Sequence, residues 1–87
     1  MHIERPQGEL PFPVPARLRV GDRFVFLPSV ERAIEWLGTP ANEALRGRLK
    51  GALELLMVAQ DSRSPVDLQA GYAALMDGLE RERLVFR

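Results

Sequence analysis

The sequence predicts one small α+β domain in which a β-hairpin precedes three helices and a short C-terminal strand, so that a small antiparallel sheet packs on the helices. Three observations predict this class. Residues 16–20 alternate apolar side chains with arginine, and the apolar run of residues 24–27 follows Gly21-Asp22, as expected for a strand pair with a two-residue turn. Residues 30–79 repeat apolar side chains at helical spacing. The chain has 87 residues, enough for one domain only.

The first 13 residues are expected to form an extended, proline-rich arm, followed by a compact domain over residues 14–87. Three of the residues 11–15 are proline, which lacks the N–H that a central strand donates to its neighbour. Phe12 and Val14 are the apolar members of this segment. We therefore expect both side chains to dock on the domain.

The hairpin register follows from its turn. Gly21 comes first in a two-residue turn of type II′, so Arg19 should lie opposite Phe24 and Arg17 opposite Phe26. The face that carries Leu18 should pack on the helices. The opposite face should display the four remaining side chains, which are Arg17, Arg19, Phe24 and Phe26.

Two helices are expected directly after the hairpin. Pro28 should end the second strand, and Ser29 should cap a helix whose apolar positions follow the i, i+3, i+4, i+7 pattern to Leu37. Gly38 is a typical stop, and Thr39-Pro40 should open a second helix that runs without a break to about Gln60.

A third helix and a short strand complete the expected fold. Ser64-Pro65-Val66-Asp67 matches the capping-box pattern, with proline at the first helical position. The core face of this helix should include Tyr72 and Leu79. A charged run then leads into the apolar segment Leu84-Val85-Phe86, which we expect to be a third strand.

This order of elements is similar to that of a known family. A proline-led strand runs into a hairpin, Ser-Val-Glu-Arg-Ala-Ile-Glu-Trp-Leu opens a helix at Ser29, and Tyr72 lies near the centre of a proline-led third helix. Over residues 12–87 the chain resembles the small bacterial family of domains of unknown function known as DUF-982. The resemblance implies the same layout of hairpin, helices and strand, and it implies no activity, cofactor or functional residue.

Composition and residue placement argue against catalysis. The only histidine is His2, in the arm, and no histidine lies near a serine to activate it as a nucleophile. The chain has no cysteine, which excludes thiolate metal sites, and Asp61, Asp67 and Asp77 are scattered. We therefore expect neither an enzyme nor a bound metal or cofactor. The lack of cysteine also fits the reducing cytoplasm, which is the location we expect.

A protein partner is the leading functional expectation. The segment from residue 53 to 59 is apolar around most of its circumference, more than a three-helix layer on a small sheet would cover. We expect a non-enzymatic protein-interaction module or a homodimeric subunit. Alternatively, the small residues of this helix meet those of the third helix internally, and Trp36 only lines the rim of the core. The candidate interface comprises Trp36, Gly51, Leu55, Met57 and Val58.

A nucleic-acid-binding module is the alternative function. Arg17 and Arg19 beside Phe24 and Phe26 would form a basic sheet face with stacking rings, as some RNA-binding sheets do. The 12 Lys+Arg are balanced by 12 Asp+Glu, so the chain lacks the positive excess of a general polyanion binder. In the alternative arrangement, the arm covers these rings. No segment reaches the ~20 apolar residues that cross a membrane, and residues 1–15 hold no secretion signal.

Overall fold

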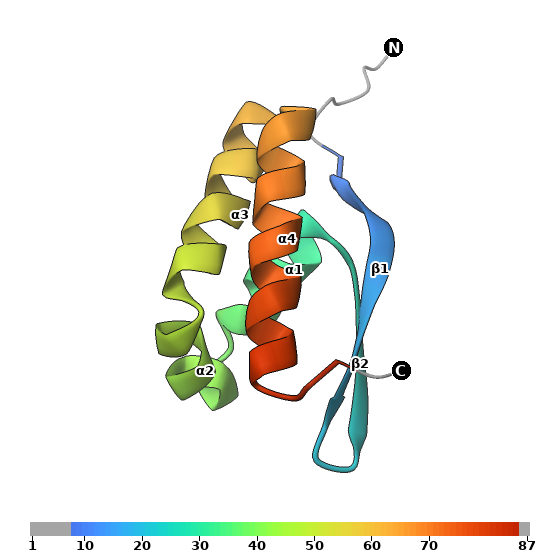
Figure 1. Ribbon diagram of the computed structural model, residues 1–87, viewed down its shortest axis with the longest axis vertical. Helices are drawn as coiled ribbons and strands as arrows, with labels where there is room; N and C mark the ends of the chain where they lie inside the picture. Colours follow the sequence, from blue (N-terminus) through green and yellow to red (C-terminus); the bar gives the residue numbers. More distant parts are fainter. Residues whose placement is uncertain (1–7, 86–87) are drawn as a thin grey trace.

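The computed structural model describes residues 8–85, which form an α+β fold with a two-stranded antiparallel sheet on one side and helices on the other (Figure 1). In chain order the elements are β1 Pro11–Val20, β2 Arg23–Ser29, α1 Val30–Leu37, the 3-10 helix η1 Pro40–Asn42, α2 Glu43–Arg48, α3 Lys50–Ser62 and α4 Pro65–Arg81.

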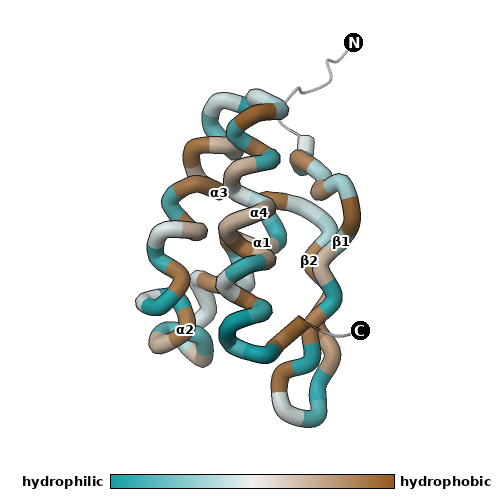
Figure 2. Tube along the Cα trace, in the orientation of Figure 1, coloured by the Kyte–Doolittle hydropathy of each residue, from teal (hydrophilic) through white to brown (hydrophobic). Residues whose placement is uncertain are grey.

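The helices cover one face of the hairpin and leave the other face bare. α3 and α4 run side by side, α1 contacts both α3 and β2, and the tip of the hairpin extends beyond the end of the helical layer (Figure 1). A hydrophilic stretch marks the end of α4 (Figure 2). The core lies between the two layers, and its fully buried large side chains include Leu18, Val30, Leu37, Leu56, Leu75 and Leu79.

The expected hairpin register is confirmed. Arg19 pairs with Phe24 and Arg17 with Phe26, and Val20 pairs with Arg23 across the turn. Gly21 has a φ of 65°, which suits a turn whose first central residue must adopt a positive φ.

The first strand begins earlier than the alternating pattern suggests. β1 includes Pro11, which pairs with Ser29, and the pairing is irregular between Pro11 and Ala16 because the prolines there cannot donate to a ladder. Phe12 docks as expected, with its ring centroid 5.0 Å from that of Tyr72. Val14 does not dock, since its side chain is exposed on the strand. Residues 1–7 of the arm, including His2, lie outside the described part of the chain.

The start of α1 is as expected. The Ser29 side chain accepts a hydrogen bond from the backbone N–H of Arg32, and α1 ends at Leu37 before Gly38. The Ser29 hydroxyl also donates to Glu9 Oε1 at 2.8 Å. This second bond ties the segment ahead of β1 to the junction between β2 and α1.

The expectation of one unbroken second helix is wrong. The segment divides into η1, α2 and α3, with the break between α2 and α3 at Leu49, whose φ is −106° and ψ 25°. Backbone hydrogen bonds still link Leu49 N to Leu45 O and Leu53 N to Leu49 O, both at 2.9 Å, so the break is a bend. Gly47 and Gly51 flank the bend and weaken the local helical preference. The described part of the chain thus has four α-helices where three were expected.

The cap of α4 is confirmed in a modified form. Ser64 Oγ accepts from the backbone N–H groups of Val66 and Asp67. The Asp67 carboxylate does not return the bond to Ser64 directly. It accepts from Ser62 Oγ at 2.6 Å, and Ser62 Oγ accepts in turn from the Ser64 N–H.

The expected C-terminal strand is not formed by residues 8–85. The chain returns to the sheet only as an isolated antiparallel bridge between Leu18 and Val85, with Arg19 N donating to Leu84 O at 2.7 Å. Phe86, the last residue of the predicted strand, lies outside the described part. One bridge leaves the sheet with two strands.

Candidate interaction surfaces

The outer face of the hairpin carries two exposed aromatic rings. Phe24 is 67% exposed and Phe26 58% exposed, because the helices cover only the opposite face of the sheet. The guanidinium carbon of Arg19 lies 5.8 Å from the centroid of the Phe24 ring, within the range of a cation–π interaction. Arg17, opposite Phe26, completes the predicted sheet face, and its four members do lie together.

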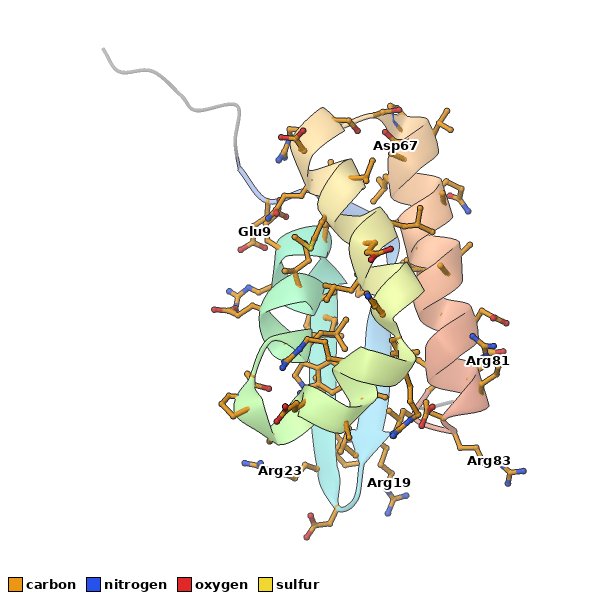
Figure 3. All side chains as sticks on the ribbon, turned by 90° about the vertical axis from the view of Figure 1, so that its left-hand side faces the viewer. Glu9, Arg19, Arg23, Asp67, Arg81 and Arg83 are labelled. Atoms are coloured by element: carbon orange, nitrogen blue, oxygen red, sulfur yellow. The ribbon has the colours of Figure 1, made fainter. Side chains whose placement is uncertain are left out.

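The hairpin also carries a local excess of positive charge. From Pro11 to Ser29 it carries Arg17, Arg19 and Arg23 against the single carboxylate of Asp22. The ion pairs found in residues 8–85 join other arginines to carboxylates, for example Arg48 to Glu82 at 2.9 Å. Figure 3 shows Arg19 and Arg23 projecting from the hairpin end of the molecule.

A second feature is a groove along the side of β2 that faces away from β1, which we call the edge groove. It consists of two hollows of about 330 and 520 Å³ that share Val25, Trp36 and Thr39. Trp36 of α1 is half-buried and forms the wall of both hollows. The further lining residues are Val20, Arg23, Phe24, Phe26, Leu27, Arg32, Glu35, Ala41 and Asn42.

The third surface is the outer side of α3. Leu55, Met57 and Val58 are between 39% and 51% exposed. A shallow hollow of about 300 Å³ between α3 and α4 is lined by Gly51 and Leu55 together with Ala74 and Asp77. Gly51 is open: apart from its neighbours along its own helix, no atom lies within 4 Å of where its Cβ would be.

The small residues of the two long helices are used unequally. On α4, Gly71 approaches the backbone of Leu55, and Gly78 packs against the side chain of Leu49, so this stripe serves internal packing. On the preceding segment, Gly47 and Gly51 face open space. The alternative that the small residues serve packing inside the monomer therefore holds for those of α4. It does not hold for Gly47 and Gly51.

The predicted interface residues do not form one patch. Gly51 and Leu55 share the hollow beside α4, whereas Trp36 lines the edge groove with residues of β2. Sequence reasoning missed the grouping of Trp36 with Val25 and Thr39. The available signal was a strand that is apolar on both faces, followed by a helix whose tryptophan lies off its main apolar stripe.

Within residues 8–85, no group of three or more histidine, cysteine, aspartate or glutamate residues is placed to hold a metal ion. In the same range every buried side-chain nitrogen and oxygen atom has a hydrogen-bond partner. Nor is any helix of this part of the chain long and apolar enough to cross a lipid bilayer.

The fold and these surfaces together define a small α+β domain with exposed apolar side chains on its hairpin and on α3. Comparisons with protein-family models, with curated proteins and with solved structures find no match for this chain. The resemblance to the DUF-982 family therefore stays a prediction.

Proposed function

We propose that the chain is a non-enzymatic protein-interaction module that self-associates through the outer side of α3. The observation that carries the proposal is the exposure of Leu55, Met57 and Val58 within four consecutive positions of one helix. Large apolar side chains gain roughly 25 cal/mol for each Å² removed from water, so a second copy that covers them would be stabilised.

The geometry of α3 supports a broad contact. At 100° per residue, Val58 lies about 60° from Leu55 and about 100° from Met57, so the three side chains form an arc on the solvent side. The buried residues Ala52, Leu56 and Ala59 occupy the opposite side of the same helix. Glu54 is exposed within the same arc, between Met57 and Val58. A helix that carries large apolar side chains on its exposed side as well as its buried side is typical of one that has a second neighbour.

Sedimentation equilibrium across the micromolar range tests this proposal. We expect a reversible dimer for the natural chain and a monomer for Val58→Arg, since the new charge would be buried at the interface. Gln60→Arg is the matched control, because residue 60 is exposed on the same helix. A natural chain that is monomeric at every concentration would contradict self-association through α3.

Nucleic-acid binding is a second candidate, favoured by the exposure of Phe24 and Phe26 beside Arg17 and Arg19. Exposed rings can stack on unpaired bases, and arginine can contact the phosphates. Fluorescence anisotropy with labelled oligouridine at about 50 mM salt tests it, because phosphate contacts are strongest at low salt. Absence of binding under those conditions would exclude this candidate.

A further inference from the structure

One edge of β2 has no neighbouring strand. The sheet order is β1–β2, so β1 covers one edge of β2 and no other strand of residues 8–85 covers its second edge. An uncovered edge presents backbone N–H and C=O groups in the spacing that another extended chain needs. The edge groove lies along this side of β2.

The register shows where the backbone groups of β2 point. Arg19, which pairs with Phe24, donates its N–H away from β2 to Leu84 O at 2.7 Å, so this pair is of the non-hydrogen-bonded type. The pair of Arg17 and Phe26 lies two residues further along and is of the same type. The N–H and C=O of Phe26 are therefore directed away from β1, towards the edge groove.

The two edges of the sheet differ in how well they are protected. β1 carries Pro11, Pro13 and Pro15, has an irregular pairing, and receives Leu84 and Val85 beside Leu18 and Arg19. These are the features by which proteins prevent a strand edge from pairing further. β2 has its single proline, Pro28, near its end, and from Arg23 to Leu27 it pairs with β1 in a regular register.

The edge groove supplies side-chain contacts for an added strand. Trp36 stands beside Val25, so an apolar side chain of the incoming segment would lie against the indole. Successive side chains of a strand alternate between its two faces, so every second residue would enter the groove. The intervening residues would extend the outer face beside Phe26.

Charge selects the occupant. The hairpin carries three arginines against one aspartate, and Arg23 lines the groove near the turn. At the other end of the groove the lining includes Glu35 and Arg32, and Arg32 pairs with Glu9 at 3.3 Å. A second copy of β2 would bring another set of these arginines to the first, whereas carboxylates would complement them.

We propose that the open edge of β2 binds an extended acidic segment of a partner protein as a third strand, with an apolar side chain of that segment against Trp36. This site lies on a different element from the α3 surface. Its existence does not depend on self-association, and the two proposals can fail separately.

Trp36 is the only tryptophan of the chain and provides the readout. The probe is a capped peptide, Glu-Glu-Val-Glu-Phe-Glu-Val-Glu-Glu. Each end of this peptide carries two consecutive glutamates, so an extended strand presents a carboxylate on both of its faces there. A carboxylate therefore reaches Arg23 whichever direction the peptide strand takes. We expect a saturable change in Trp36 fluorescence with one peptide per chain. A counterpart peptide with lysine at every glutamate position should have an affinity at least about tenfold lower. Equal binding of the two peptides would overturn the charge argument.

A matched pair of variants tests backbone pairing. Phe26→Ala removes the ring and keeps the N–H, whereas Phe26→Pro removes both. Because the Phe26 N–H points away from β1, proline there should leave the β1–β2 ladder in place, which the circular dichroism of the variant checks. We expect the affinity of Phe26→Pro for the acidic peptide to be at least about fivefold lower than that of Phe26→Ala. Equal affinities would overturn strand addition.

Two further measurements keep the proposal falsifiable if Phe26→Pro does not fold. Arg23→Glu should weaken binding of the acidic peptide about fivefold, and Lys50→Glu, the same change of charge on exposed α3, should leave it within about twofold. Equal losses would indicate a diffuse charge effect and overturn the site. Oligouridine that displaces the peptide and binds more tightly would overturn the proposal in favour of a nucleic-acid surface.

Discussion

Gly78 of α4 lies directly against the side chain of Leu49, at the point where the middle helical segment bends. A Cβ atom at residue 78 would overlap Leu49 Cδ2, so the close approach requires glycine unless Leu49 moves. Leu49 is 3% exposed and has little room to do so. The bend and the glycine thus accommodate one buried side chain.

Gly78→Ala should lower the free energy of unfolding by about 1–2 kcal/mol, because the strain of overpacking exceeds the gain in helix propensity. Urea unfolding followed by Trp36 fluorescence measures the change. Gly51→Ala is the control, since the space around Gly51 is open and the same substitution should stabilise by about 0.5–1 kcal/mol. A change of stability in the same direction for both variants would contradict this account of Gly78.

Phe12→Ala should lower the free energy of unfolding by about 3–5 kcal/mol, because the ring is buried and packs on Tyr72. Val14→Ala, two residues along the same strand, should change it by about 0.5 kcal/mol or less, because Val14 is exposed. Thermal unfolding of both variants provides the comparison. A small effect of Phe12→Ala would mean that the proline-rich start of β1 does not contribute to the core.

Ser64→Ala should lower the free energy of unfolding by about 1 kcal/mol, because two N–H groups of the first turn of α4 lose their acceptor. Ser64→Asp should retain most of the stability, since aspartate caps helices as well as serine does. Urea unfolding of the two variants distinguishes loss of the cap from a general effect of altering the loop. Equal destabilisation by alanine and aspartate would exclude the capping role.

Arg63 combines an unfavourable backbone with favourable contacts. Its φ is 58°, in the left-handed region, and its guanidinium pairs with Glu31 Oε2 at 3.5 Å and donates to the Gly8 carbonyl. Arg63→Gly loses the contacts but relieves the backbone, whereas Arg63→Ala loses the contacts only. We expect the glycine variant to be about 1 kcal/mol more stable than the alanine variant in urea unfolding. The reverse order would show that the left-handed backbone carries no strain.

Local signals in the sequence predicted much of the fold. Gly21-Asp22 predicted the register of Arg19 with Phe24 because a two-residue turn leaves one way to pair its strands. Ser29 and Ser64 predicted helix starts because a cap bonds to N–H groups only two or three residues away. The candidate surfaces were predicted less well. The sequence indicated the surplus apolar residues of α3, but it grouped Trp36 with them and not with β2.

The sequence by itself thus determined the α+β class, the hairpin register and the helix caps, since each depends on neighbours along the chain. Only the tertiary structure decided the bend at Leu49, the single bridge at Val85 and the exposure of Phe24 and Phe26. These features depend on packing between segments far apart in the sequence, where one close contact such as Leu49 with Gly78 outweighs local preference. The edge groove belongs to the same group, because α1 and β2 form it only once they pack together.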